Sequence, residues 1–288
     1  MLKYLFSLIV LFAVPTLAQE LTVLEKPRPQ MLRDALRVQV HAALDKRLQA
    51  YEARTDPAEI TAWQQDLRSK FVESLGGYPK RTPLNPQIVG KFEADGYRVE
   101  NLIYESRPQF FVTANLYLPK TKPPYPAVLV PCGHSPNGKA AGAYQRISIL
   151  LAKHGIAALC YDPVGQGERK QILKTNTKGD PLPIGEFTAT GEHTITGVAP
   201  ILLGENLASY RIWDGIRSID YLTSRPDIDP KRIGCTGNSG GGMMTSYLVA
   251  LDDRIQAAAP GCFITTTRIK NERPGPGDAE QNIFSQTA

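Results

Sequence analysis

A serine at the centre of a glycine-rich pentapeptide is the residue whose setting most clearly predicts chemistry. Ser239 lies in Gly237–Gly241, which has the pattern G-x-S-x-G. Residues 232–236 before it are typical of a strand, and residues 243–251 after it are typical of a helix. Glycines let strand and helix approach closely on such a turn, so that the serine hydroxyl stands clear of the sheet. The pattern predicts a nucleophile elbow, with a structural glycine turn as the alternative.

The sequence offers four histidines as proton acceptors for that serine, and none of them follows it. They are His41, His134, His154 and His193. On a nucleophile elbow the chain order is Ser, then Asp or Glu, then His, and a serine without a base is a poor nucleophile. We therefore expect the acid and the histidine to lie beyond Ala288, and this chain alone to hydrolyse activated esters feebly.

The four histidines differ in their local setting. His193 lies in a polar, irregular insertion, residues 170–205, and is interpreted as a solvated loop residue; a base supplied from the insertion is the alternative. His134 is interpreted as a loop residue whose side chain contacts substrate, in preference to a catalytic base. His41 and His154 fall on predicted helices and are interpreted as structural.

The first eighteen residues have the pattern of a secretory signal peptide. Lys3 supplies the positive start, residues 4–14 are apolar, and Thr16–Ala18 offers a cleavage site after Ala18. The apolar stretch is too short to cross a bilayer, which disfavours a membrane anchor, and no later segment is long and apolar enough to do so. The mature protein is expected to be secreted or periplasmic, without a membrane span.

Charge and cysteine usage narrow the classes of partner and cofactor. The 288-residue chain has a formal net charge of +5 without a block of lysine or arginine, which argues against nucleic acid. Cys132, Cys160, Cys235 and Cys262 fall in or at the end of apolar runs. They are interpreted mostly as buried thiols, with one bridged pair as the alternative. No metal and no other cofactor is expected, because the sequence shows no His/Asp ligand cluster.

Two helices are expected in an amino-terminal extension, residues 19–87. Apolar residues recur at every fourth position from Leu32 to Leu48, and again over residues 60–75 after a helix start at Thr55–Pro57. We expect both helices to pack on the catalytic core, residues 88–288.

The core alternates apolar strands with helices. Further strands are predicted at 89–92, 97–106, 110–118, 126–132, 156–161 and 255–262, and helices at 143–154 and 206–224. This order predicts an α/β fold with a doubly wound, mostly parallel sheet, and places Ser239 at the carboxyl ends of its strands. The outer edge of strand 255–262 would normally be covered by another strand. The sheet is therefore predicted to be incomplete at its C-terminal end, and the isolated chain prone to aggregation.

Three stretches of the core carry a resemblance. Pro131–Ser135 is similar to a loop that helps to form an oxyanion hole, Tyr161–Arg169 is similar to a D-x-x-G-x-G-x-R turn, and Gly237–Gly241 is the elbow. With these stretches in this order, residues 88–265 resemble the α/β-hydrolase superfamily. The closest likeness is to the branch of acetyl xylan esterases, dienelactone hydrolases and prolyl-oligopeptidase-type catalytic domains.

The resemblance implies roles for several residues. The N–H groups of Gly240 and His134 would form the oxyanion hole, with Gly133 letting the backbone approach. Asp162 and Arg169 would fix their own turn by hydrogen bonds, without a catalytic role.

The implied function is a secreted serine ester hydrolase that works through an acyl-enzyme. Its substrate would be a small ester or an acylated polysaccharide, such as acetyl xylan. A peptidase of the prolyl-oligopeptidase type is one alternative, although it would need a β-propeller that residues 19–87 are too short to form. A truncated or non-catalytic binding protein of the same fold is another.

Overall fold

A seven-stranded sheet organises the residues that the computed structural model describes, which are 29–175, 178, 181–185, 187–272, 278–281 and 283. The strand order is β1-β2-β3-β5-β4-β8-β9. The strands are β1 (Gln87–Ala94), β2 (Tyr97–Arg107), β3 (Phe110–Pro119), β4 (Tyr125–Pro131), β5 (Ala157–Tyr161), β8 (Ile228–Asn238) and β9 (Ile255–Gly261). The signal peptide predicted at residues 1–18 lies outside the described residues.

The sheet is mixed, with an antiparallel and a parallel half. β1, β2 and β3 pair antiparallel, and β3 also runs antiparallel to β5. β5, β4, β8 and β9 are parallel to one another, so their carboxyl ends meet at one edge. β5 is buried along its whole length, as expected of a strand covered on both faces. The predicted α/β fold is confirmed, but the sheet is mixed and not mostly parallel, because β1, β2, β3 and β5 pair antiparallel.

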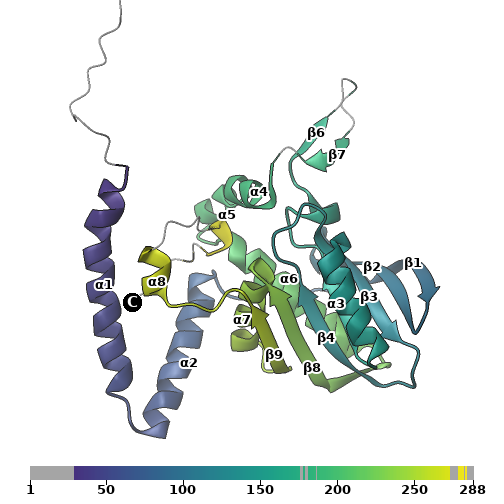
Figure 1. Cartoon of the computed structure of the whole chain (residues 1–288), viewed down its shortest axis with the longest axis horizontal. Coiled ribbons are helices and arrows are strands. Elements are labelled where there is room, and N and C mark those ends of the chain that lie inside the picture. Colours follow the sequence, from purple (N-terminus) through teal and green to yellow (C-terminus); the bar gives the residue numbers. More distant parts are fainter. Residues whose placement is uncertain are drawn as a thin grey trace, which may run out of the picture.

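Helices cover both faces of this sheet (Figure 1). α3 (Gly142–Lys153) packs on one face, against side chains such as Val130 and Cys160. α6 (Leu207–Ser224) and α7 (Gly240–Leu251) pack on the other, against side chains such as Leu129 and Leu159. Successive strand residues thus point to opposite layers, as the twofold period of a strand requires.

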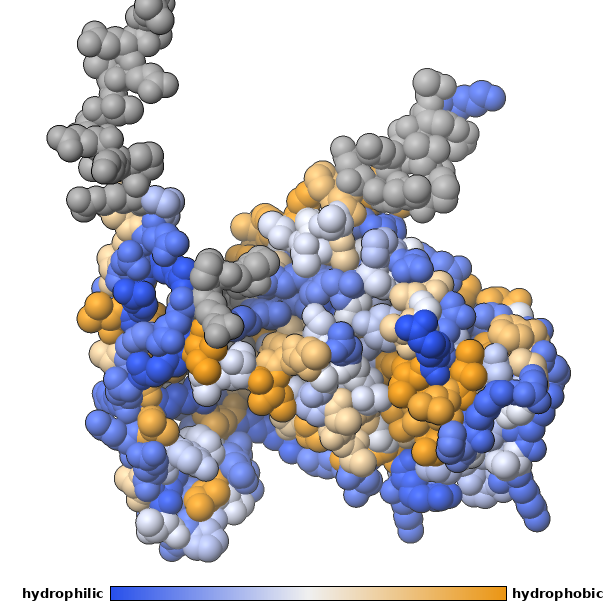
Figure 2. All heavy atoms as spheres, viewed as in Figure 1, coloured by the Kyte–Doolittle hydropathy of each residue, from blue (hydrophilic) through white to orange (hydrophobic). Residues whose placement is uncertain are grey.

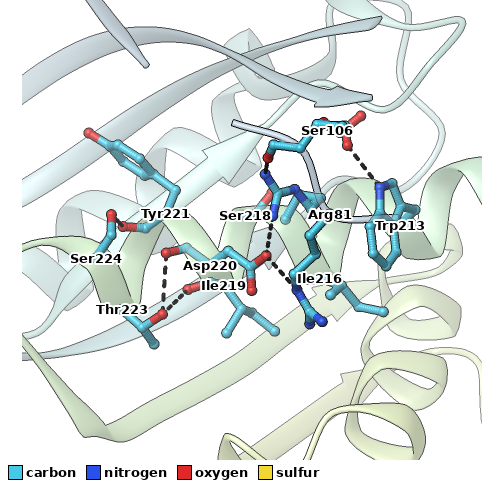
Figure 3. A network of polar contacts seen from close by, with 12 residues as sticks. Arg81, Ser106, Trp213, Ile216, Ser218, Ile219, Asp220, Tyr221, Thr223 and Ser224 are labelled. Carbon is cyan, nitrogen blue, oxygen red and sulfur yellow. Dashed lines mark hydrogen bonds and ion pairs between the residues drawn. The ribbon is translucent and has the colours of Figure 1, made fainter. Parts of the chain in front are cut away.

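Polar contacts hold α6 in place against the sheet (Figure 3). The Trp213 indole N–H donates to the Ser106 carbonyl at the end of β2, over 2.8 Å. Near the other end of α6, the Arg81 guanidinium lies 3.1 Å from the Asp220 carboxylate. Both contacts join α6 to segments far away in the sequence, which fixes the helix relative to the strand ends.

The two amino-terminal helices differ in how they pack. α2 (Pro57–Ser74) begins at the Asp56 cap, whose carboxylate accepts from the Ala58 N–H, and its Phe71 ring lies 5.2 Å from Tyr247 on α7. α1 (Met31–Glu52) stands apart at the left of Figure 1 and has no buried residue. The predicted apolar stripe is largely exposed there, for example at Leu32, which is 73% exposed. The expected packing of both helices on the core is therefore observed for α2 and is wrong for α1.

α1 contacts α2, where the ring centroids of Tyr51 and Trp63 lie 5.1 Å apart, and it also contacts a short helix later in the chain. That helix is α8 (Thr267–Glu272), and its Arg268 contacts the Asp45 carboxylate. His41 on α1 lies 3.8 Å from Glu272. The two ion pairs with α8 are at least partly exposed, so they contribute little to stability.

The insertion 170–205 is more regular than predicted. It forms a small antiparallel pair, β6 (Leu173–Thr175) and β7 (Pro181–Gly185), followed by α4 (Ala189–Thr196) and α5 (Val198–Leu202). The prediction of an irregular segment is wrong because elements this short show no clear apolar period. Figure 2 shows apolar side chains at the surface over α4 and α5, and those exposed there include Ile195, Val198, Ile201, Leu202 and Leu203.

Two further features concern the edge of the sheet and the search for a membrane-spanning helix. β9 is an edge strand in the described part of the chain, and Ala257, Ala258 and Ala259 on it are exposed. Within the same part, no helix combines the length and apolar character needed to cross a bilayer.

Candidate active site

Ser239 occupies a strained turn between β8 and α7. Its backbone has φ 56° and ψ −117°, a conformation that favours glycine. Two backbone hydrogen bonds hold the residue there: its N–H donates to the Gly261 carbonyl over 2.9 Å, and its carbonyl accepts from the Met243 N–H over 2.9 Å. The sheet and the helix thus impose a backbone conformation that serine alone would not choose, as on a nucleophile elbow.

Glycines on either side make this close approach possible. A Cβ atom on Gly241 would lie 2.2 Å from the Pro131 carbonyl oxygen, and a Cβ atom on Gly237 would lie 2.6 Å from the same oxygen. Either contact is far inside van der Waals distance. The G-x-S-x-G pattern therefore reflects a steric requirement of this turn.

The loop after β4 lies directly beside the elbow. A Cβ atom on Gly133 would lie 3.3 Å from the Gly240 nitrogen, so the loop touches the first residue of α7. The Gly133 N–H donates to the Tyr144 hydroxyl over 2.5 Å. Within the described residues, no acceptor takes up the N–H of Gly240 or of His134. Both donors expected in an oxyanion hole are therefore available.

The turn at 161–169 supports this loop without contributing to the cavity. Gln166 donates to the Gly133 carbonyl over 2.7 Å. The buried Asp162 carboxylate accepts from the Lys139 N–H and from Thr113, each over 2.7 Å. Arg169 donates to the Asp162 carbonyl over 2.9 Å and to the buried Asp214 carboxylate over 2.7 Å. The architecture implied for Asp162 and Arg169 is observed.

A cavity of about 510 Å³ opens at the carboxyl ends of the parallel strands. It brings the elbow together with the loop after β4, with α4 and with the segment that follows β9. The lining residues are His134, Thr188, Thr190, Gly191, Thr194, Ser239, Gly240, Cys262, Phe263, Thr265, Lys270, Asp278 and Gln281.

Two carboxylates from the carboxyl-terminal segment meet two histidines beside the elbow. The Asp278 Oδ2 atom lies 2.6 Å from His134 Nε2 and 3.1 Å from His193 Nδ1. Glu280 is fully buried and contacts the guanidinium of Arg211 on α6. Asp278, Glu280 and Arg211 were not predicted from the sequence. The one signal for Asp278 and Glu280 was their position just after a Gly/Pro-rich segment.

The protonation of this cluster follows from burial and contacts. Burial alone would raise the pKa of Asp278, but the contacts from His134 and His193 outweigh it and hold that pKa well below its usual range. Burial lowers the pKa of His193, although the contact with Asp278 opposes that shift. The cluster therefore favours an ionised Asp278.

The sequence comparison decides the family of this chain. The profile of the family described as acetyl xylan esterase (AXE1) matches residues 46–265, which include the elbow, the loop after β4 and the turn at 161–169. The chain belongs to the acetyl xylan esterase family.

Two curated proteins are also similar to this chain, at low sequence identity. YtaP of Bacillus subtilis (strain 168) is 29% identical over 218 residues, which cover 68% of this chain and 63% of that protein. PA2218 of Pseudomonas aeruginosa is 21% identical over 223 residues, which cover 76% of this chain and 49% of that protein. The chain thus spans 63% of the length of the first of these curated relatives and 49% of the second.

Solved structures share the fold. The crystal structure of BF1801 from Bacteroides fragilis NCTC 9343 superposes with a TM-score of 0.65 at 21% identity, covering 81% of this chain and 64% of that chain. Methylesterase BT1017 superposes with a TM-score of 0.54 at 28% identity, covering 79% of this chain and 45% of that chain. The α/β-hydrolase architecture expected from the resemblance is confirmed.

Two expectations about this family member are wrong. His193 is not a solvated loop residue, because it lies on α4 and is 0% exposed. The expectation that the chain has no His/Asp cluster is also wrong. One ligand atom from each of His134, His193, Asp278 and Glu280 lies within 4.8 Å of the others. Sequence spacing could not reveal this cluster, because its members come from four separate segments.

These four side chains form an ion-pair cluster rather than an evident metal centre. The buried Arg211 guanidinium already contacts Glu280. A metal ion in the same space would meet a like charge at low dielectric.

The remaining histidines and the cysteines have simpler settings. His154 caps the end of α3, with its Nδ1 atom 2.8 Å from the Leu150 carbonyl oxygen. Cys132 and Cys160 are buried and unbridged, with their sulfur atoms 3.4 Å apart. Cys235 is also buried, whereas Cys262 is exposed and lines the cavity. The interpretation as buried thiols therefore holds for three of the four.

Proposed function

We propose that this chain carries the nucleophile of a secreted serine carbohydrate esterase, with acetylated xylan as its substrate. The observation that carries the proposal is Ser239 on its strained turn, at a cavity beside two available backbone N–H groups. Membership of the acetyl xylan esterase family supports the reaction class. The predicted signal peptide at residues 1–18 supports export.

The chemistry would begin with attack of Ser239 Oγ on the ester carbonyl carbon. The carbonyl oxygen becomes an oxyanion, and the N–H groups of Gly240 and His134 would stabilise it. The first N–H sits at the amino end of α7, where the helix dipole favours negative charge. Loss of one such donor typically costs about 100- to 1,000-fold in kcat. Collapse of the intermediate expels the sugar alcohol and leaves an acyl-enzyme, which water hydrolyses to the free acid.

The cavity lining is compatible with a hydroxyl-rich substrate. Hydroxyl groups from Thr188, Thr190, Thr194 and Thr265 line it. A hydroxyl can donate and accept, which suits sugar hydroxyls that do both. Because one solved relative is named a methylesterase, methyl esters of sugar acids are the substrate class to compare with acetyl esters.

Covalent labelling with a fluorophosphonate, followed by peptide mass spectrometry, tests the nucleophile without requiring turnover. We expect the label on Ser239, at most feeble release of acetate from acetylated xylan, and loss of both in Ser239→Ala. Ser246→Ala is the matched control, because this serine also lies on α7 but bonds only to the Gly242 carbonyl. Labelling of Ser239→Ala at the rate of the unmodified chain would refute the proposal. Preference for methyl esters over acetyl esters would refute the assigned substrate alone.

A further inference from the structure

Both residues expected to supply the oxyanion hole lie against one segment from much later in the chain, residues 278–281. The His134 Nε2 atom lies 2.6 Å from Asp278 Oδ2 and 3.3 Å from Glu280 Oε1. A Cβ atom built on Gly240 would lie 3.3 Å from the same Glu280 oxygen. The segment thus contacts the side chain of one donor residue and lies close to the other donor residue.

Buried polar contacts fix this segment to two helices. Glu280 is fully buried and contacts the guanidinium of Arg211, which lies on α6 and is 2% exposed. Asp278 is 5% exposed, and its Oδ2 atom lies 3.1 Å from His193 Nδ1 on α4. Because water has little access to either carboxylate, the Asp278 oxygens have a defined place in the fold.

Hydrogen bonds hold the neighbours of His134 but leave its own peptide N–H free. Gln166 donates to the carbonyl oxygens of Gly133 and Ser135, over 2.7 Å and 3.1 Å. The Gly133 N–H donates to the Tyr144 hydroxyl, which removes it as an oxyanion donor. Among the described residues, the polar contacts of His134 itself are those of its ring with the segment 278–281.

We propose that Asp278 is a positioning residue for the oxyanion hole, an inference that rests on the proposed esterase function. Asp278 holds the His134 ring, and through the ring it holds the loop so that the His134 N–H is aimed at the carbonyl oxygen of an ester bound at Ser239. The contact of Glu280 with Arg211 anchors the segment that carries Asp278. In this scheme the His134 ring takes no proton from Ser239.

Positioning matters because an oxyanion hole works only when its donors are aimed before the reaction begins. A donor stabilises the oxyanion from about 3 Å, without reorganisation during the chemical step. A displacement of about 1 Å in an active site can cost about 100-fold in rate. The tether between Asp278 and the His134 ring is therefore worth a measurable part of the rate, although neither side chain touches the reacting atoms.

The charge of Asp278 acts in the opposite direction to its positioning role. A carboxylate close to a developing oxyanion repels it, and this repulsion is strong where water is excluded. If Asp278 acted through its charge alone, removing the charge would speed the reaction of Ser239. If the positioning role dominates, removing the charge slows that reaction, so the sign of the effect decides between the two.

The rate of fluorophosphonate labelling at Ser239 measures the oxyanion hole, because the phosphoryl oxygen occupies it. For Asp278→Asn we expect the labelling rate at saturating probe to fall about 10- to 100-fold, while the probe concentration for half of that rate changes little. Asp278→Glu should restore part of the rate. Asp253→Asn is the matched control, because this carboxylate is 85% exposed and pairs with Arg68; its rate should be unchanged.

A double variant tests whether Asp278 acts through the His134 ring. His134→Ala removes the ring but keeps the backbone N–H, so it should lower the labelling rate about as much as Asp278→Asn does. Because both changes break the same tether, the double variant should label no more slowly than either single variant. Losses that multiply would show that Asp278 acts by another route and would refute the inference.

Hydrogen exchange of the loop supplies a readout that needs no reaction. In Asp278→Asn, peptides that cover residues 131–137 should exchange faster, whereas β5 should exchange as in the unmodified chain. Faster exchange in β5 as well would indicate general loosening of the fold and would refute a specific positioning role.

The outcomes separate this inference from the proposed function. If Asp278→Asn labels as fast as the unmodified chain, or faster, while Ser239→Ala does not label, the positioning role is refuted and the esterase proposal stands. If Ser239→Ala labels normally, or if the unmodified chain does not label at all, the esterase proposal is itself refuted and this inference fails with it.

Discussion

Replacing Ser239 by glycine should make the protein more stable while removing its nucleophile. The residue is held at φ 56° and ψ −117° by its backbone bonds to Gly261 and Met243. Its hydroxyl makes no hydrogen bond with the described residues. A non-glycine residue in such a region carries strain of about 1–3 kcal/mol, and glycine would release most of it.

The expected gain in the free energy of unfolding is the strain that glycine releases, reduced by the greater conformational freedom of glycine in the unfolded chain. That freedom costs about 0.5–1 kcal/mol relative to alanine. The net gain of Ser239→Gly over Ser239→Ala should therefore be about 1 kcal/mol, which is roughly 2–4 °C in Tm for a chain of this size. Ser239→Ala itself should melt close to the unmodified protein, because alanine keeps the strain and removes only an unbonded hydroxyl.

The measurement is a pair of thermal unfolding curves, with a second pair as control. Ser69 is an exposed serine within α2, where the backbone is helical. There Ser69→Gly should melt lower than Ser69→Ala, by about 1 kcal/mol in free energy of unfolding. The difference between glycine and alanine should thus have opposite signs at the two positions. If Ser239→Gly melts no higher than Ser239→Ala, the turn stores no strain and the reasoning fails.

Three further predictions concern groups around the site. Asp214→Asn should lower the free energy of unfolding by about 3 kcal/mol in urea titrations, because it leaves the buried Arg169 guanidinium without its anion; a loss below 1 kcal/mol would contradict this. The pKa of Asp278 is lowered on folding, so its contribution to stability is present above the usual carboxyl pKa of about 4 and is lost as the pH falls through the folded value. Unfolding curves between pH 7 and pH 3 should therefore show a shallower loss for Asp278→Asn. Cys262 alone should react with a maleimide in the folded protein, since the other three thiols are buried; labelling of two or more before unfolding would be the contrary result.

Local patterns account for the elements that the sequence predicted well. The predicted strands 97–106 and 110–118 became β2 and β3 with ends shifted by at most one residue, because apolar periodicity and turn residues act within a few positions. The short helices α4 and α5 escaped prediction because their five to eight residues give no full period. For α1 the helix itself was predicted correctly, but a stripe of leucines says nothing about what covers it.

The sequence by itself determined the elbow and the loop beside it. The elbow needs Gly237 and Gly241, which lie four residues apart. The loop that contains Gly133 directly follows an apolar strand. Each feature therefore depends on one short stretch of the sequence. Only the tertiary structure decided which groups surround Ser239. Asp278 contacts His134 and His193, although both lie far before it in the sequence. Arg211, which lies on α6, contacts Glu280 in the same segment as Asp278. No local spacing predicts these contacts. They depend on how the parallel strands bring their carboxyl ends to one edge of the sheet, and on how α4 and residues 278–281 pack over that edge.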